Sequence, residues 1–591
     1  MLKDKFDPKS YQGDLVNILT DISKFPANKW SYKKYHKILR MYPKDGNRMF
    51  GRDQLVRGYR FLVEEGKMQY SEEIMDRIRL RPVRTVSGVT PVTVLTKPFP
   101  CPGKCIFCPN DVRMPKSYLK DEPGAQRAER NSFDPYLQTY NRLLALQNIG
   151  HNTGKVELII LGGTWSFYPE SYQIWFIKRC FDALNDFGTR DNRKKVRVTN
   201  NYEEADRVPN RKLDGSRKSY NQIINEVVHN KGKKLISETE QADWDALIEA
   251  QERNEDANSR CIGLVIETRP DWINENEIVK FRKLGATKIQ IGIQSLNDKV
   301  MELNKRGHGK AETEEAIRLL RMGGFKIHAH WMPNLYGSTP ELDIRDFKRL
   351  WGKSIRPDEL KIYPTSIIEN TGLLDLYKEG KYKPYTYEEL LHVMVSILPL
   401  TPRYCRLTRI IRDIPSTDII AGNKLSNFRE IAEKELQKLE KRCQCIRCRE
   451  IQTGKFSEQD LEIEQIKYRS TIGEEIFISV KTRETDKIVA FLRLTLPTKS
   501  ISERHFIDEL SNSAIIREVH VYGQAVDVGK KSEKKAQHMG LGTILVEKAQ
   551  EISRDKGFKK IAVISAIGTR NYYRKLGFYL ESLYMTKYLA P

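Results

Sequence analysis

Apolar residues follow a strand-and-helix rhythm over the middle of the chain. Between residues 92 and 363, short runs rich in β-branched residues alternate with longer stretches in which apolar residues recur every three or four positions. The short runs cover residues 92–96, 156–161, 262–267, 287–293, 325–331 and 359–363. Continuously apolar strands separated by amphipathic helices predict a parallel sheet covered on its outer face. Six such units predict a partial (β/α)6 barrel of the α/β class.

The remainder of the chain divides into three further parts. Residues 1–80 have helical apolar spacing and many basic residues, and residues 466–591 combine strand-like runs with helix patterns. We therefore predict a helical N-terminal region, a barrel, a linker and an α+β domain at 1–80, 81–400, 401–465 and 466–591. Within the barrel, residues 188–258 are polar with weak apolar periodicity and predict a partly flexible insertion.

Charge and composition indicate which kinds of partner and which location the protein has. The 591 residues include 101 Lys and Arg against 78 Asp and Glu, a net charge of +23. Such a basic chain favours a polyanionic partner, because neutralising phosphates releases counterions. The basic and aromatic stretch within 1–80 is typical of an RNA-binding arm, although a plain helical extension fits it nearly as well. The chain has neither a run of about 18 apolar residues nor a signal peptide, so we expect a cytoplasmic protein.

Three of the nine cysteines lie directly after the first predicted strand. Their spacing is C-x3-C-x2-C, at Cys101, Cys105 and Cys108. Polar residues follow later strands in the same way, at Gly162, Gly163, Glu267 and Gln294. Because reacting groups of α/β barrels lie at the carboxyl ends of the strands, these residues predict one site. Three thiolates can hold a 4Fe–4S cluster by three irons, whereas structural zinc needs a fourth donor that the loop lacks.

A second cysteine group lies in the predicted linker. Cys443, Cys445 and Cys448 have the spacing C-x-C-x2-C, which suits tetrahedral zinc. The fourth ligand is not local, and Cys405 or a distant histidine could supply it. A second iron–sulfur cluster and three free thiols are the alternatives.

A glycine-rich loop precedes a helix pattern near the C-terminus. In "QHMGLGTILVEKAQ", Gln537, Gly540 and Gly542 come just before apolar residues with helical spacing. Amides at a helix N-terminus bind phosphate groups, so the loop predicts a pyrophosphate site. A plain helix start in a generic α/β domain is the alternative.

The barrel motifs together resemble those of the radical S-adenosylmethionine (SAM) superfamily. These motifs are "CPGKCIFCPN", "LGGT", "IETRPD" and "GIQS". The resemblance implies that SAM binds the open corner of the cluster and yields a 5′-deoxyadenosyl radical, with electrons from an external donor. It also implies which residues bind SAM, namely Gly162, Gly163, Glu267, Gln294 and Arg306.

The C-terminal part resembles the GCN5-related N-acetyltransferases, through "QHMGLG" and "GTRNYYRKLGF". That resemblance implies that acetyl-CoA binds with its pyrophosphate on the glycine turn. The residues that match by position are Lys155, Glu518, Val519, His520, Val521, Gln537, Gly540, Leu541, Gly542, Thr543 and Tyr573. Of these, Lys155 and Tyr573 are implied to act in catalysis: Lys155 would connect the barrel to acetyl-CoA, and Tyr573 would guide the thioester or a water.

The two halves together resemble the catalytic subunit of Elongator and its stand-alone bacterial and archaeal relatives. The similarity runs from about residue 80 to the end and includes "FDPYLQTYNRL", "KVELIILGGT", "KIYPT", "RDIPS" and "REVHVYG". It implies that a radical at the acetyl methyl adds to C5 of the wobble uridine in a tRNA anticodon loop, and that thioester hydrolysis leaves 5-carboxymethyluridine. One departure is Glu369, at a position where the family often has arginine.

The cysteine pattern also indicates whether the protein needs partner subunits. The cysteine-rich linker and the short cysteine spacing resemble prokaryotic members, so we expect a monomer or homodimer that needs no other Elongator subunit. Two rival hypotheses are a protein lysine acetyltransferase with a structural iron–sulfur cluster and a non-catalytic RNA-binding scaffold. The complete motif sets in both halves favour the tRNA-modifying enzyme over both.

Overall fold

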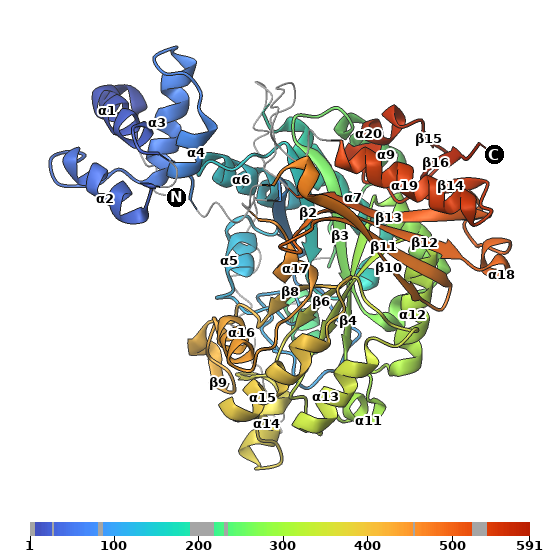
Figure 1. The fold of residues 1–591 in the computed structure, drawn as a ribbon. Helices are drawn as coiled ribbons and strands as arrows, with labels where there is room; N and C mark the ends of the chain where they lie inside the picture. The colour runs from blue at the N-terminus through green and yellow to red at the C-terminus, as the bar shows by residue number, and fades with distance from the viewer. Residues whose placement is uncertain are drawn as a thin grey trace.

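The chain folds around two seven-stranded sheets, with a group of helices at the N-terminus (Figure 1). The computed structural model describes residues 6–26, 29–80, 87–188, 218–229, 235–452, 456–522 and 540–590. The predicted site residue Gln537 and parts of the predicted insertion 188–258 lie outside these ranges. No helix in the described ranges is long and apolar enough to span a membrane.

The first sheet is parallel throughout and has the order β1-β2-β3-β4-β5-β6-β8. Its strands are β1 (Thr90–Leu95), β2 (Lys155–Leu161), β3 (Arg260–Thr268), β4 (Lys288–Gln294), β5 (Lys326–Trp331), β6 (Glu359–Ile362) and β8 (Arg406–Ile410). The six predicted strands are confirmed, and β8 is a seventh that the sequence analysis missed. β8 extends the sheet beyond residue 400, and it forms one edge while β1 forms the other.

Helices cover one face of this sheet, because only that face is continuously apolar. On β2, Val156, Leu158 and Ile160 are buried, whereas the alternate residues are half-buried. The helices between the strands are α5 (Pro123–Arg130), α6 (Pro135–Asn148), α7 (Glu170–Asp186), α8 (Tyr220–His229), α9 (Trp244–Asn254), α10 (Glu275–Lys283), α11 (Asp298–Leu303), α12 (Lys310–Met322), α13 (Pro340–Arg349), α14 (Gly372–Lys378) and α15 (Tyr387–Ile397). Leu247 and Ala250 of α9 belong to the main core, so this part of the predicted insertion is a packed helix.

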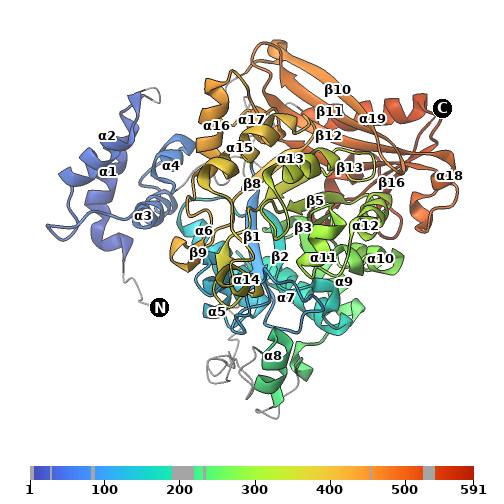
Figure 2. The ribbon, with the colours of Figure 1, turned by 90° about the horizontal axis from the view of Figure 1, so that it is seen from below.

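The N-terminal helices form a core of their own. They are α1 (Gln12–Ser23), α2 (Tyr32–Met41), α3 (Arg52–Glu64) and α4 (Glu72–Ile78), which confirms the predicted helical character. In both ribbon views they stand apart from the sheets (Figures 1 and 2). Arg60 and Arg79 attach them to the barrel by donating to the carbonyls of Gln147, at 2.8 Å, and Gly150, at 2.7 Å.

The second sheet is mixed and has the order β10-β11-β12-β13-β14-β16-β15. Its elements are β10 (Leu461–Arg469), β11 (Gly473–Thr482), β12 (Ile488–Pro497), α18 (Lys499–Ser502), β13 (Ser513–Val521), α19 (Leu541–Asp555), β14 (Lys560–Val563), α20 (Arg570–Lys575), β15 (Tyr579–Leu580) and β16 (Met585–Tyr588). β13 and β14 pair in parallel only over residues 513–516 of β13. β13 continues to Val521, so the two strands diverge beyond Ile516. This arrangement confirms the predicted α+β fold.

Candidate active site

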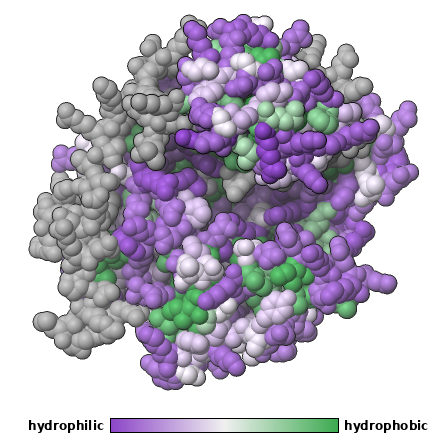
Figure 3. Space-filling view, turned by 90° about the vertical axis from the view of Figure 1, so that its left-hand side faces the viewer, coloured by the Kyte–Doolittle hydropathy of each residue, from purple (hydrophilic) through white to green (hydrophobic). Residues whose placement is uncertain are grey.

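A cavity of about 510 Å³ opens at the carboxyl ends of the first sheet's strands. It is lined by eight of the residues predicted from the sequence: Cys101, Cys105, Cys108, Gly162, Gly163, Glu267, Gln294 and Arg306. The structure therefore brings these eight residues together, because all but Arg306, which follows α11, lie at or just after the carboxyl end of a parallel strand. Figure 3 shows that the surface on the side of the N-terminal helices is mainly hydrophilic and is hollowed below them.

The cysteine loop lies among buried cations. Arg306 donates to the sulfur of Cys105 at 3.4 Å, and Arg269 approaches the same sulfur at 3.9 Å. A hydrogen bond from Cys108, together with these arginines, holds the pKa of Cys105 well below its usual range. Cys105 therefore favours the thiolate, the form in which cysteine binds iron.

The spacing of the sulfurs distinguishes this loop from a site for one ion. In the described part of the chain, the sulfurs of Cys101, Cys105 and Cys108 are not all within 4.8 Å of one another. Cysteines that bind one tetrahedral zinc at 2.3 Å are about 3.8 Å apart, whereas those of a cluster bind different irons. As placed here, the three sulfurs therefore do not form the compact set that one tetrahedral zinc requires.

The strand ends provide further polar groups toward the cavity. Burial raises the pKa of Glu267, whose carboxylate accepts a hydrogen bond from Tyr118 at 3.3 Å. Gln294 has a φ of 66°, and its buried Oε1 has no hydrogen-bond partner within the described residues. Gly162 has a φ of 155°, and a Cβ there would lie 1.8 Å from Oγ1 of Thr96. Gln294 thus leaves an unsatisfied acceptor where an amino or hydroxyl group of a ligand would bind, and the close approach of Thr96 requires glycine at position 162.

The sequence analysis did not assign several residues that the structure adds to this cavity. They are Tyr118, Arg269, Lys361 and Arg412. Arg412 follows the missed strand β8 and pairs with Glu122 at 2.6 Å. Lys361 lies in the quoted motif "KIYPT" and could have been found from its position on the last predicted strand.

A second cavity, of about 290 Å³, lies where β13 and β14 diverge. Glu518, Val519, His520 and Tyr573 line it, as their predicted role requires, and burial lowers the pKa of His520 to about 4. Beyond Ile516, β13 has left β14, so its edge is open toward this cavity.

The predicted glycine turn begins α19. Gly540 has a φ of 68° and precedes Leu541, Gly542 and Thr543 in the first turn. Val521 lies close to this turn, since its Cγ2 would be 3.6 Å from a Cβ on Gly542. Lys155 is the first residue of β2, at the opposite end of that strand from the cysteine loop, and burial lowers its pKa. The roles of these residues in binding and catalysis stay predictions.

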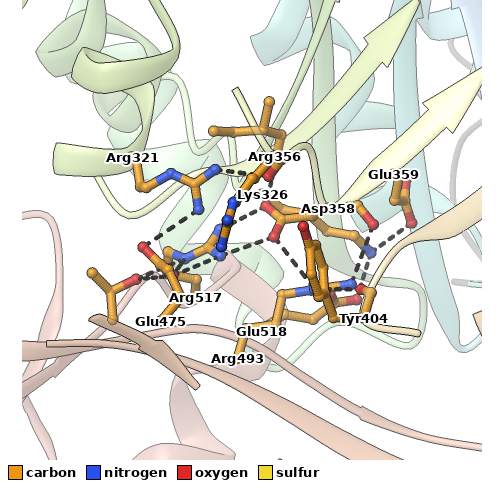
Figure 4. Close-up of polar contacts among 12 residues, drawn as sticks. Arg321, Lys326, Arg356, Asp358, Glu359, Tyr404, Glu475, Arg493, Arg517 and Glu518 are labelled. Atoms are coloured by element: carbon orange, nitrogen blue, oxygen red, sulfur yellow. Dashed lines mark hydrogen bonds and ion pairs between the residues drawn. The ribbon is translucent and has the colours of Figure 1, made fainter. Parts of the chain in front are cut away.

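Buried ion pairs join the barrel to the second sheet (Figure 4). Arg517 contacts both carboxylate oxygens of Asp358, at 2.6 and 2.8 Å, and contacts Glu475 at 3.1 Å. The complete group, the interdomain ion cluster, has four cations and four anions: Arg321, Lys326, Arg493, Arg517, Asp358, Glu359, Glu475 and Glu518. Arg517 is the extra residue of a β-bulge, since Arg493 pairs with Glu518 and Leu494 with Ile516. A bulge redirects a side chain, and here it directs Arg517 at the barrel.

The linker cysteines form a compact group between α16 (Phe428–Lys438) and the second sheet. The sulfurs of Cys443, Cys445 and Cys448 are all within 4.8 Å of one another, and Cys445 and Cys448 are 3.7 Å apart. The latter distance is close to the separation of about 3.8 Å expected for two thiolates on one tetrahedral zinc. Within the described residues, the sulfur of Cys405 does not belong to this group.

The linker also contacts the edge strand β8. Ile446, at the start of α17 (Ile446–Arg449), donates its amide to the carbonyl of Cys405 at 2.9 Å. Arg429 and Arg447 donate to the carbonyls of Leu407, at 3.0 Å, and Thr408, at 2.6 Å. The linker therefore satisfies the carbonyls of Leu407 and Thr408 in β8 and that of Cys405 just before it.

Comparison with known proteins agrees with this architecture. Residues 234–347 match the radical SAM superfamily, residues 357–438 the radical SAM C-terminal domain, and residues 445–578 the acetyltransferase (GNAT) family. The chain is 38% identical to the tRNA uridine(34) acetyltransferase of Methanocaldococcus jannaschii, over 88% of this chain and 89% of that protein. It is 34% identical to human Elongator complex protein 3, over 88% of each.

A solved structure is similar over most of the chain. It is that of an archaeal Elp3 from Methanocaldococcus infernus with an N-terminal deletion, with a TM-score of 0.65 and 34% identity. The match covers 85% of this chain and 99% of that one. The radical SAM and GNAT matches correspond to the two sheets described above. The chain therefore belongs to the family of the tRNA uridine(34) acetyltransferases and Elongator complex protein 3.

Proposed function

We propose that this protein modifies the wobble uridine of tRNA, using SAM and acetyl-CoA to form 5-carboxymethyluridine. The observation that carries the proposal is the presence of two cavities on one barrel, one beside the cysteine loop and one where β13 and β14 diverge. The printed names of the relatives, tRNA uridine(34) acetyltransferases, support the substrate. We further propose that the enzyme is cytoplasmic and needs an external electron donor but no other Elongator subunit.

In this proposal, the barrel site binds the cluster and SAM. Cys101, Cys105 and Cys108 hold the cluster, which with SAM supplies a radical able to abstract hydrogen from a methyl group. The amide oxygen of Gln294 receives SAM, because it is buried at the cavity without a partner among the described residues, and Gly162 lines the same cavity. Glu267 and Arg306, predicted to bind SAM as well, line the same space.

The second cavity binds acetyl-CoA. The open edge of β13 provides backbone amides and carbonyls that can bond the amide groups of the pantetheine, just as they would bond a neighbouring strand. The first turn of α19, at Leu541 to Thr543, faces the pyrophosphate with its amides and the positive end of the helix dipole. Tyr573 lines the cavity and guides the thioester. Lys155, the first residue of β2, acts from the barrel.

The tRNA binds on the hydrophilic face that carries the N-terminal helices. The net charge of +23 favours RNA, and α2 carries Lys33, Lys34, Lys37 and Arg40. The hollow below these helices in Figure 3 is accessible to an anticodon loop, whose bases can be unstacked into a pocket.

Anaerobic incubation with tRNA, SAM, acetyl-CoA and reductant tests the proposal. We expect nucleoside mass spectrometry to detect 5-carboxymethyluridine, and we expect omission of either SAM or acetyl-CoA to abolish it. If iron-loaded enzyme instead acetylates lysine peptides without SAM and leaves tRNA unchanged, the proposed function is wrong.

The linker group is proposed to bind zinc. We expect about one zinc per chain besides the iron of the cluster, and we expect Cys445→Ala to lose that zinc while keeping the iron. Elemental analysis of the anaerobically purified variants measures both metals. Cys405→Ala is the matched control, because Cys405 is buried nearby but outside the group, and it should keep zinc. Equal zinc content in wild type and Cys445→Ala would contradict the assignment.

A further inference from the structure

The two cavities approach each other inside the barrel. The cavity beside the cysteine loop extends down the strands to Pro91, the second residue of β1. The cavity at the diverging strands reaches the same residue from the other end. Pro91 thus lines both cavities. The interior of the barrel lies between the two proposed sites, whose substrates have to meet for the proposed reaction.

The inward face of β2 connects the two cavities. Glu157 lines the cavity at the diverging strands, and Leu161 lines the cavity beside the cysteine loop. Ile159 lies between them on the same face, because side chains of a strand alternate. All three are half-buried, although the other face of β2 is fully buried. Thr93 on the neighbouring strand β1 is also half-buried and lines the cavity of the cysteine loop.

The open form of the barrel explains this accessibility. In closed (β/α)8 barrels, layers of inward side chains fill the interior. Here β1 and β8 are opposite edges of one sheet, so the interior beside β1 and β2 is not closed by a further strand of that sheet. The inward side chains of β1 and β2 therefore border open space instead of a layer of packed side chains.

We propose that this inward face of β1 and β2 lines a passage for the pantetheine arm of acetyl-CoA, which carries the acetyl group from the diverging strands to the cysteine loop. The thioester stays intact during the passage, and no bond forms or breaks. The inference rests on the proposed function and adds the route by which its two substrates meet.

The dimensions suit this route. From Glu157 to Leu161, four residues of strand span about 13 Å. A pantetheine arm is comparable to an extended peptide of about five residues, or roughly 17 Å, so it is long enough for this span once it leaves the edge of β13. At the entrance, Lys288 pairs with Glu157 at 2.7 Å and Lys326 pairs with Glu359 at 2.8 Å, so each carboxylate beside the uncharged arm has a cation.

Ile159 offers a direct test, because its side chain lies midway along the route. Ile159→Phe adds volume to the passage, whereas Ile159→Leu conserves volume. We expect Ile159→Phe to lower carboxymethyluridine formation at least about tenfold and Ile159→Leu to change it less than about twofold. The acetyl-CoA Kd, measured by calorimetry, should stay within about threefold of the wild-type value in both variants, because the binding cavity itself is unchanged.

A trapping experiment locates the acetyl end directly. Bromoacetyl-CoA is an electrophilic analogue of acetyl-CoA, and we expect it to alkylate the cysteine of Thr93→Cys in cluster-loaded enzyme. Peptide mass spectrometry detects the product. Excess CoA and the additional substitution Ile159→Phe should both prevent the reaction. The control Val94→Cys places the thiol on the buried face of β1, where no alkylation is expected.

The outcomes separate the two proposals. Equal product from Ile159→Phe and Ile159→Leu, or alkylation of Thr93→Cys that persists with Ile159→Phe, overturns the passage. Wild-type enzyme that forms no carboxymethyluridine overturns the proposed function, even where the alkylation pattern supports the passage.

Discussion

Replacing Cys105 by alanine is expected to abolish carboxymethyluridine formation, with a loss of roughly a thousandfold or more, because the hydrogen-abstracting chemistry belongs to the cofactor and not to the side chains. Cys105 is also the thiolate that Arg269 and Arg306 surround, so its loss removes the best stabilised ligand of the loop. Visible absorption and low-temperature EPR after reduction measure the cluster, and nucleoside mass spectrometry measures the product.

A second cysteine provides the matched control. Cys180 is fully buried in α7 and belongs to the main apolar core rather than to either cavity. Cys180→Ala should therefore keep the iron content, the EPR signal and the product, at a modest cost in stability. Product formation by Cys105→Ala at the wild-type rate would show that the loop does not hold the reacting cofactor.

The largest effect on stability is expected from Arg517→Ala. The substitution leaves Asp358 and Glu475 buried with fewer cations, and breaking a buried pair in this way costs about 3–5 kcal/mol of unfolding free energy. Burial alone would raise the pKa of Asp358, but Arg517 and Arg493 outweigh it and hold that pKa below its usual range. The contribution of Asp358 is therefore present above about pH 4 and is lost as the pH falls through its lower folded-state pKa.

An exposed ion pair of the same sheet is the control for this measurement. Arg483 lies 3.6 Å from Glu462, and its side chain is 61% exposed. Arg483→Ala should change the free energy of unfolding in urea by about 0.5 kcal/mol or less. A loss below about 1 kcal/mol for Arg517→Ala at pH 7 would mean that the interdomain ion cluster does not hold the two sheets together.

Much of the barrel site could be predicted because its signals are local. Most of the residues predicted for the cavity lie at the end of a short apolar run, and a parallel sheet places the ends of all such runs on one edge. The cysteines, Gly162 and Gln294 were found in this way. Arg269 was in a quoted motif but received no role, because spacing alone does not show that its guanidinium turns back toward Cys105.

Other features could not be predicted because their partners are distant or their pattern is weak. β8 has only five residues, two of which are arginines, and reads as a loop, since only its pairing with β6 makes it a strand. Arg517 and Asp358 are 159 residues apart in the sequence, so nothing local indicates their contact. The bulge that directs Arg517 becomes visible only in the register of β12 and β13.

The linker's contacts with β8 have a consequence for solubility. A bare edge strand offers its backbone groups to any other chain and so invites intermolecular β-pairing. Here Ile446, Arg429 and Arg447 occupy the carbonyls on that edge, next to the group of three cysteines. Loss of these linker contacts would therefore expose an unpaired strand edge beside the barrel, where another chain could pair and start aggregation.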